Sequence, residues 1–202
     1  MKRLIITGLL AFLISTTFLS DNPPGWFQQE LPVNDVTRDI SFTDSLNGWI
    51  ITEGSFNNND TGYIMRTTNG GANWSIQFDS TLTLNVIQFV DNEYGYAGGG
   101  FGRAAFLKTT NGGIEWQYTA PFGSTFYGIL DLQFVNKDTG WVCSNDDIGG
   151  GIFKTTNGGS SWQRQTTASQ LAPVKLFFIN PDTGWAIEND GFFKTTDSGT
   201  SW

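Results

Sequence analysis

The feature that most constrains this chain is a string of eight residues that occurs four times. It reads "TTNGGANW" at 67–74, "TTNGGIEW" at 109–116, "TTNGGSSW" at 155–162 and "TTDSGTSW" at 195–202. A string that recurs four times is poorly suited to be a single active site and better suited to be a piece of scaffold. We name this string the box.

A second string, F-x-[DN]-x-x-x-G-[WY], precedes every box. Its leading residues are Phe42, Phe89, Phe134 and Phe178, which lie 47, 45 and 44 residues apart. A period of this length is typical of solenoids and propellers. The second unit holds four short strand candidates, at 86–89, 95–99, 104–108 and 116–119, and four strands per unit is typical of a propeller blade. The sequence therefore predicts an all-β propeller with about four four-stranded blades, in units near 40–74, 86–116, 130–162 and 174–202.

The box has the composition of a stabilised hairpin between the third and fourth strands of a blade. Asn and Gly both tolerate positive φ, which a tight turn requires. The Asn or Asp side chain and the first Thr can accept hydrogen bonds from backbone N–H groups, and the Trp can fold back under the hairpin. We therefore expect a structural role for Thr67, Asn69, Gly71 and Trp74, for Thr109, Asn111, Gly113 and Trp116, for Thr155, Asn157, Gly159 and Trp162, and for Thr195, Asp197, Gly199 and Trp202.

The pattern [ST]-x-[DN]-x-G-x-x-W resembles the Asp-box, or bacterial neuraminidase repeat, of sialidases, sortilin-type receptors, xyloglucan hydrolases and the photosystem II assembly-factor family. The longer unit is most similar to the last group and its secreted bacterial relatives. The resemblance covers roughly residues 26–202 and implies a propeller whose boxes are structural and lie away from the functional site. Three boxes carry Asn where the family is named for Asp, and only Asp197 keeps the acid, which argues further against a metal role.

Both ends of the chain bear on the number of blades. "WFQQ" at 26–29 is similar in type to "WSIQ" at 74–77, so it is predicted to be a fourth strand without its own hairpin. Trp202 would begin another fourth strand. We therefore expect the N-terminal part of a propeller of six to eight blades, forming an open arc, with a complete four-bladed ring as the alternative. Because an open arc exposes a blade flank, residues 21–202 alone are expected to be poorly soluble or oligomeric.

The first twenty residues, "MKRLIITGLLAFLISTTFLS", carry two basic residues followed by an apolar run that is short for a membrane span. They predict a secretory signal peptide, with an uncleaved anchor as the alternative. Removal of this segment leaves nine basic and 19 acidic residues, a net charge of −10. Such a charge disfavours nucleic acid or an anionic membrane as a partner. The expected location is extracellular, at the cell surface or periplasmic.

Residue types also limit the chemistry. The chain contains no His and a single Cys, Cys143, which excludes Ser-His-Asp catalysis, Cys-His catalysis and any internal disulfide. Cys143 aligns with apolar or small residues of the other units and is predicted to lie in the core. A glycosidase needs two carboxylates at a suitable separation, and no acidic residue stands out of register with the repeat. We therefore expect no catalytic residue, no metal and no cofactor.

The lengths of the strand connections predict where a ligand binds. From the aromatic of G-[WY] to the first Thr of the box the separations are 18, 13, 14 and 10 residues, whereas the first turn and the box keep constant lengths. Turns between antiparallel strands alternate between two faces, so the variable connections share the face without boxes, where binding usually resides. The candidate binding residues are Phe56, Phe101, Arg103, Phe122, Tyr127, Asp146 and Asp147. The aromatic ones have an alternative role as plugs between blades, and the Asp pair has alternatives as a Ca²⁺ site or a solvated turn.

Taken together, these patterns favour an exported, non-enzymatic propeller that binds a protein or glycan partner. Two alternatives stay open. The resemblance implies an assembly factor for a membrane protein complex. A sialidase-like glycoside hydrolase would need three clustered Arg residues, whereas Arg66 aligns with a Lys in each of the other units and is predicted to be a solvated strand end.

The scaffold role of the box can be tested at its Trp residues. We expect Trp74, Trp116 and Trp162 to be buried, and replacement of any one by Ala to lower the free energy of unfolding by about 3–5 kcal/mol. Chemical denaturation of the three variants measures this loss. A variant that keeps the wild-type unfolding curve but no longer binds its ligand would contradict the scaffold role.

Overall fold

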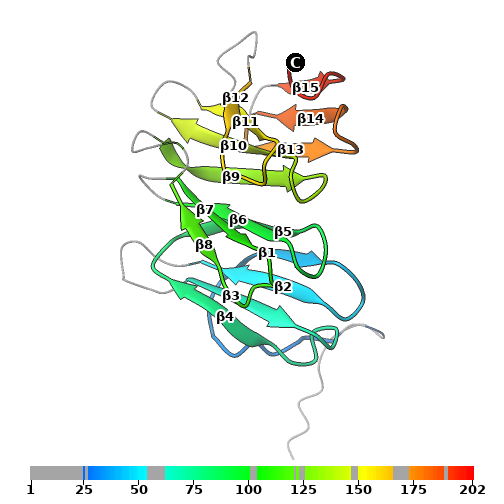
Figure 1. Ribbon diagram of the computed structural model, residues 1–202. Coiled ribbons are helices and arrows are strands. Elements are labelled where there is room, and N and C mark those ends of the chain that lie inside the picture. Colours follow the sequence, from blue (N-terminus) through cyan, green and yellow to red (C-terminus); the bar gives the residue numbers. More distant parts are fainter. Residues whose placement is uncertain are drawn as a thin grey trace, which may run out of the picture.

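The computed structural model describes residues 25, 27–53, 62–100, 104–120, 122, 126–146, 150–165, 173–188 and 191–202. The described chain is all-β and forms four antiparallel sheets, each built from consecutive strands. The sheets follow one another in chain order, and the first and fourth lie at opposite ends of an open row (Figure 1). This arrangement confirms the predicted propeller class, and we number the sheets as blades 1 to 4.

Each blade pairs its strands in chain order. Blade 1 contains β1 (Thr37–Phe42), β2 (Gly48–Thr52), β3 (Gly62–Thr67) and β4 (Ser75–Ser80). Blade 2 contains β5 (Leu84–Phe89), β6 (Gly95–Gly99), β7 (Ala105–Thr109) and β8 (Gln117–Thr119). Blade 3 contains β9 (Phe126–Phe134), β10 (Gly140–Asp146), β11 (Gly151–Thr155) and β12 (Gln163–Arg164). The described part of blade 4 contains β13 (Lys175–Phe178), β14 (Gly184–Ile187) and β15 (Phe192–Thr195). The first strand of every blade packs beside the first strand of the next.

The Asp or Asn at the third position of each string stabilises the first turn of its blade. In blade 3, Asn136 Oδ1 accepts hydrogen bonds from the backbone N–H groups of Asp138, at 2.9 Å, and Thr139, at 2.8 Å. This is an Asx turn, in which the side chain takes the place of a backbone acceptor. The equivalent residues of the other blades make the same pair of bonds: Asp44, Asp91 and Asn180.

The box forms a wider loop than the tight Asn-Gly hairpin that the sequence predicts. In blade 1 the loop consists of residues 68–74, the last seven residues of the box, between β3 and β4. Thr67 Oγ1 accepts from Gly71 N at 2.9 Å, and Asn69 Oδ1 accepts from the N–H four residues later at 2.9 Å. Positive φ falls on the two glycines, 69° at Gly70 and 89° at Gly71, and not on Asn69. The expectation of a positive φ at Asn is therefore corrected, because the Gly pair supplies the left-handed backbone. The predicted role of Asn as a hydrogen-bond acceptor is confirmed.

The fourth box keeps this network with one departure. Thr195 Oγ1 accepts from Gly199 N at 2.8 Å, as in the other boxes. Ser198 replaces the first Gly and nevertheless holds a φ of 62°. Its hydroxyl donates to Pro181 O at 2.7 Å in the first turn of the same blade, which offsets the strain of a side chain in this region. Hydrogen bonds from the Ser201 hydroxyl and N–H lower the pKa of Asp197 to about 2, so Asp acts as the same acceptor as Asn.

The Gly of G-[WY] is required because a Phe ring lies against it. Phe134 and Gly140 face each other across β9 and β10. A Cβ added at Gly140 would lie 2.5 Å from the Phe134 ring. The other three blades give the same result, with separations of 2.5, 2.3 and 2.4 Å at Gly48, Gly95 and Gly184. The string has the same length in all four units because a five-residue turn places its Gly directly against the ring of its leading Phe.

The box tryptophans are half-buried and not buried, which corrects the prediction. Each stands edge-on to the Phe of its own blade, as Trp116 does to Phe89 with centroids 5.8 Å apart and an interplanar angle of 88°. Within the described residues, the four enclosed indole nitrogens meet no hydrogen-bond acceptor. Edge-to-face attraction therefore carries this contact. We therefore expect each Trp→Ala change to lower the free energy of unfolding by about 3 kcal/mol, the lower end of the predicted range.

The N-terminal segment also differs from its predicted form. Residues 27–29 are not in a strand, and Trp26 lies outside the described residues. Gln29 nevertheless docks on the first box, where its Nε2 donates to Gly70 O at 3.3 Å. The segment therefore lies beside blade 1 without strand pairing.

The Gly–Phe contact gives a direct test. Gly140→Ala is expected to lower the free energy of unfolding by about 1–3 kcal/mol, because the added methyl group overlaps the Phe134 ring. Asp138→Ala, at an exposed position in the same turn, serves as the control and is expected to change stability little. Urea denaturation of both variants measures the difference. Equal stabilities for the two variants would show that the ring does not depend on the missing side chain.

Candidate interaction face

The strand connections fall into two groups that lie on opposite faces. On one face the first turns span five residues in all four blades, and the box loops span seven residues in blades 1 to 3. The two kinds of turn are joined within a blade, for example from Gly158 N to Asp138 O at 2.8 Å. On the other face the connections from second to third strands span nine, five, four and four residues, and those between blades span three, six and ten. The predicted separation of constant and variable connections is confirmed.

The structure places three of the seven candidate binding residues. Tyr127 and Asp146 lie in β9 and β10, at the strand ends that lead into variable connections. Phe122 is half-buried and packs on Phe153, at 4.4 Å, and on Trp162, at 5.9 Å. It therefore fills the role of a hydrophobic plug. The other four candidates lie outside the described residues: Phe56, Phe101, Arg103 and Asp147.

A flat aromatic stack joins each blade to the next. Trp49 of β2 lies on Phe89 of β5, with centroids 3.5 Å apart and an angle of 7°. The same stack recurs between Tyr96 and Phe134, at 3.6 Å and 3°, and between Trp141 and Phe178, at 3.7 Å and 10°. The last aromatic of one string therefore contacts the first Phe of the following string. The repeated string encodes both halves of a single interface.

A cation covers the other face of the stacked indole rings. The Arg66 guanidinium lies 5.1 Å from the Trp49 ring centroid, and Lys154 Nζ lies 5.3 Å from that of Trp141. Each cation stands directly opposite its ring on the neighbouring strand. The prediction that Arg66 is a solvated strand end was wrong, because the guanidinium contributes a cation–π contact.

The polar edge of each stacked ring reaches the turns of the next blade. Trp49 Nε1 donates to Gly112 O at 3.0 Å, and Trp141 Nε1 donates to Ser198 O at 3.2 Å. Tyr96 replaces Trp in blade 2, and its hydroxyl donates to Lys137 O at 2.5 Å. One side chain thus supplies both the apolar area and the hydrogen bond that fix the neighbouring blade.

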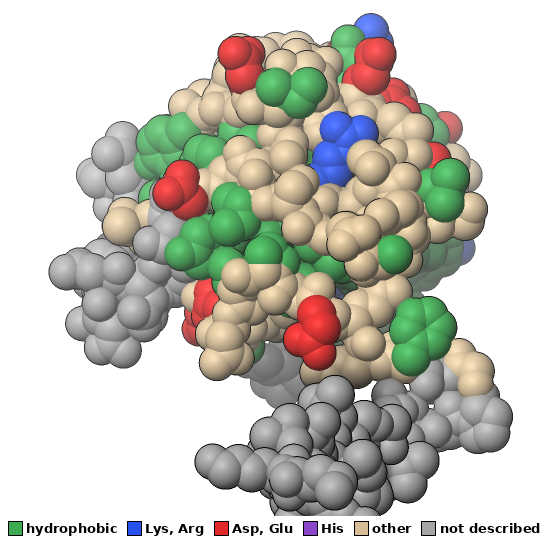
Figure 2. All heavy atoms as spheres, turned by 90° about the horizontal axis from the view of Figure 1, so that it is seen from below, with side chains coloured by type: hydrophobic (Ala, Val, Ile, Leu, Met, Phe, Trp, Pro, Cys, Tyr) green, Lys and Arg blue, Asp and Glu red, His purple; other side chains and the backbone are tan. Residues whose placement is uncertain are grey.

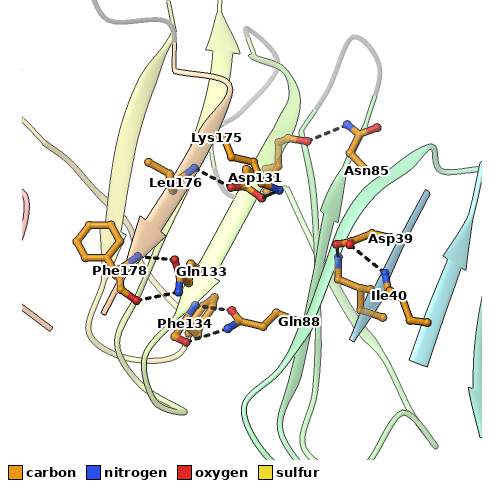
Figure 3. A network of polar contacts seen from close by, with 12 residues as sticks. Asp39, Ile40, Asn85, Gln88, Asp131, Gln133, Phe134, Lys175, Leu176 and Phe178 are labelled. Atoms are coloured by element: carbon orange, nitrogen blue, oxygen red, sulfur yellow. Dashed lines mark hydrogen bonds and ion pairs between the residues drawn. The ribbon is translucent and has the colours of Figure 1, made fainter. Parts of the chain in front are cut away.

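Glutamine side chains clamp adjacent first strands together. Gln133 Nε2 donates to Phe178 O at 2.9 Å, and Gln133 Oε1 accepts from Phe178 N at 2.6 Å (Figure 3). Gln88 holds Phe134 in the same way, at 3.1 and 2.6 Å. The clamp satisfies backbone groups that point away from their own sheet, so it replaces a ladder hydrogen bond between blades.

Acidic side chains extend the clamp along the first strands. Asp131, in β9, accepts from Leu176 N at 2.7 Å and pairs with Lys175 Nζ at 3.1 Å. Burial raises the pKa of Asp131, against the opposing pull of that N–H group and of the ammonium. Asp39 occupies the same repeat position in β1 and accepts from Ile87 N at 2.8 Å. These carboxylates are committed to holding the next blade.

Sequence reasoning missed these interblade residues, although a signal was present. The residue directly before the leading Phe is polar in three units: Ser41, Gln88 and Gln133. In a strand whose neighbouring residues are apolar, such a residue faces either solvent or another polar partner. The partner here is a backbone in a different blade, which no local pattern identifies.

The single thiol and the acidic side chains of the described residues show no sign of a reactive or metal-binding site. Cys143 is fully buried in the core, as predicted, and burial raises the pKa of its thiol. In the part of the chain that the structure describes, His, Cys, Asp and Glu side chains form no group of three suited to a metal ion. The same residues include no helix long and apolar enough to cross a membrane.

The sheets, turns and stacks define the class of this protein: a β-propeller built from repeats of about 45 residues. Neither the protein-family models nor the curated proteins gave a match. Among solved structures, the chain is similar to YCF48 bound to a D1 peptide, with 20% identity and a TM-score of 0.63 over 90% of this chain and 56% of that one. It is also similar to the GH74 xyloglucanase of Xanthomonas campestris, with 11% identity and a TM-score of 0.61 over 78% of this chain and 26% of that one. An ancestral GH74 enzyme is also similar, with 17% identity and a TM-score of 0.65, over 86% of this chain and 25% of that one.

At these identities the similarity shows the fold. It agrees with the propeller that the resemblance to the photosystem II assembly-factor family implied. The chain spans just over half the length of the YCF48 structure and about a quarter of the GH74 enzymes.

The glutamine clamp can be tested by removing its polar atoms. Gln133→Leu keeps the approximate volume but leaves Phe178 N–H and C=O without partners, so we expect a loss of about 2–4 kcal/mol in the free energy of unfolding. Hydrogen exchange at the Phe178 amide should also become faster. Gln77→Leu is the matched control, since the Gln77 side chain donates to the neighbouring Ser75 hydroxyl within its own strand. A Gln133→Leu protein with unchanged stability and exchange would contradict the clamp.

Proposed function

We propose that this protein is an exported, non-enzymatic propeller that binds a polypeptide partner through its variable face. The observation that carries the proposal is the segregation of the strand connections. The constant turns share one face and are held by their own Asx and box hydrogen bonds, whereas the connections that vary in length share the other. A rigid scaffold with variable loops on one side is the usual arrangement of a recognition surface.

Two further points favour a polypeptide over other ligands. YCF48, whose fold is similar, was solved with a D1 peptide bound. The net charge of −10 after removal of the first twenty residues favours a neutral or basic segment and disfavours nucleic acid. An assembly role, in which the propeller holds a segment of a membrane protein during its incorporation into a complex, is a specific form of this proposal.

Glycan recognition is the second candidate, because two of the similar structures are GH74 enzymes. A glycosidase requires a pair of carboxylates flanking the scissile bond. Two of the acids that the structure describes, Asp39 and Asp131, are occupied by backbone N–H groups of the next blade. Aromatic residues of the variable connections remain compatible with binding a glycan without hydrolysing it.

A binding assay with two probes distinguishes these candidates. We expect a phage-displayed peptide library panned on the full chain to yield peptides that bind saturably, and xyloglucan oligosaccharides to be neither bound nor hydrolysed. Replacing residues 53–61 by the shorter connection 188–191 should weaken peptide binding by at least tenfold, since this changes only a variable connection.

Asn111→Ala, on the box face, is the matched control and is expected to lower stability while leaving peptide affinity unchanged. If only the Asn111→Ala variant lost peptide binding, the binding site would lie on the box face, which would contradict the proposal. Release of reducing sugar from xyloglucan would replace the binding proposal with an enzymatic one.

A further inference from the structure

Three of the four boxes contain an Asn–Gly pair, the dipeptide that deamidates most readily in proteins. In an unfolded chain the backbone nitrogen of the Gly attacks the side-chain amide of the Asn, because Gly has no side chain to hinder the approach. The chain's fourth pair, Asn47–Gly48, lies outside the boxes, at the start of β2. The boxes therefore hold three sites of potential chemical change: Asn69–Gly70, Asn111–Gly112 and Asn157–Gly158.

The box favours this reactive pair for structural reasons. Asn157 Oδ1 accepts a hydrogen bond from Ser161 N at 2.9 Å, and this bond closes the loop. Gly158 holds a φ of 64°, in the region that favours Gly. A Cβ at Gly158 would also lie 2.9 Å from Lys137 O, in the first turn of the same blade. The geometry of the turn thus selects the dipeptide that is chemically least stable.

Burial does not protect these pairs from water. Asn69 and Asn157 are exposed, and Asn111 is half-buried. On the side of the molecule formed by blade 1, uncharged polar side chains and backbone make up much of the surface (Figure 2). Water and hydroxide therefore reach the box asparagines, and any protection has to come from the way the reacting groups are held.

The nitrogen that would attack is hydrogen-bonded in all three boxes. Each Gly N–H donates to the carbonyl of the fifth residue of the string, in the first turn of the same blade: Gly70 to Leu46 at 2.9 Å, Gly112 to Glu93 at 2.9 Å and Gly158 to Asp138 at 2.8 Å. We name this hydrogen bond the turn–box bond. The N–H points at the first turn, and the lone pair that loss of its proton would leave points there as well. Attack on the Asn side chain requires this nitrogen to rotate, which breaks the turn–box bond.

The Asx turn holds the acceptor of the turn–box bond in place. In blade 3, Asn136 Oδ1 accepts from the N–H of Asp138 at 2.9 Å, and the carbonyl of the same Asp138 accepts from Gly158. In blade 2, Asp91 holds Glu93 in the same way, at 2.8 Å. One side chain of the first turn therefore controls the turn–box bond of its own blade.

The fourth box shows that one product of deamidation fits this loop. Asp197 Oδ1 accepts from the Thr195 hydroxyl at 2.8 Å and from Ser201 N at 2.9 Å. The Ser201 hydroxyl donates to Asp197 Oδ2 at 2.6 Å, whereas the equivalent Ser161 hydroxyl accepts from Asn157 Nδ2 at 2.8 Å. Because a hydroxyl can do either, Asp and Asn satisfy the same loop. Isoaspartate, the other product, adds a methylene group to the main chain and changes the spacing on which these bonds depend.

We propose that Asn69, Asn111 and Asn157 are concealed deamidation sites, each released when the turn–box bond of its own blade opens. The freed Gly nitrogen loses its proton to solvent, and its lone pair attacks the Asn Cγ. The bond from Cγ to Nδ2 then breaks, and ammonia leaves with a proton returned by solvent. Water opens the resulting five-membered imide at either carbonyl, which gives Asp or isoaspartate. In the closed blade this sequence cannot begin, because the nitrogen is directed at the first turn.

Peptide mapping by mass spectrometry, after incubation of the full chain at mildly alkaline pH, tests the proposal. In the folded wild type each box Asn is expected to deamidate at least tenfold more slowly than in the same chain unfolded in urea. Asn136→Ala should speed deamidation of Asn157 by about tenfold, because Asp138 loses the hydrogen bond that holds it. Asn69 and Asn111 should keep their wild-type rates, and they report in the same molecule on whether the rest of the fold is intact.

Two further variants show whether the effect follows the blade. Asp91→Ala is the reciprocal change and should release Asn111 alone. Asn180→Ala is the matched control, because it loosens the first turn of blade 4, whose box carries Asp197–Ser198 in place of Asn–Gly. It should leave all three sites at their wild-type rates.

Several outcomes would overturn the proposal. Equal acceleration at all three sites in Asn136→Ala would show that general unfolding, and not the turn–box bond of blade 3, governs the reaction. An unchanged rate at Asn157 in this variant, or a folded wild type that deamidates as fast as the chain in urea, would do the same. Asn157→Asp reproduces the Asp product and should unfold at the wild-type urea concentration. A clear loss of stability in this variant would contradict the fit of that product.

Discussion

The fold depends on one interaction: the flat stacking of an aromatic ring from one blade on a Phe from the next. Other features of the repeat serve this contact. The Phe must lie flat, so the residue beneath it is a Gly. The indole ring must be held in place against this Phe. In blade 1 and blade 3 a cation covers its other face, and its N–H donates to the box of the following blade. A sheet cannot extend by ladder hydrogen bonds from one blade to the next, and side chains must supply the connection.

Polar groups of the constant turns are satisfied locally, and this separates stability from recognition. Asn136 and Asn69 each accept backbone N–H groups of their own turn, so neither turn needs support from outside the blade. The connections on the opposite face differ in length from blade to blade. The same scaffold can therefore present different loops without loss of stability. Similar propellers include both a peptide-bound YCF48 and GH74 enzymes.

Blade 4 departs from the other blades at one repeat position. Phe177 stands where the preceding three blades carry a polar residue, and its side chain is 56% exposed. It places an apolar ring where the glutamines of blades 2 and 3 form a clamp.

The sequence by itself determined the class of fold, the strands of each blade and the separation of constant from variable connections, because these follow from local spacing and turn chemistry. It did not determine which residues join the blades. Arg66 was predicted to be solvated and lies over Trp49, and the partners of Gln133 and Asp131 are backbone groups about 45 residues away. It also misjudged the box, where Gly70 and Gly71 rather than Asn69 take positive φ. Such contacts were decided only by the tertiary structure, because each depends on the rotation that places one blade beside the next, and the residues of a single blade do not specify that rotation.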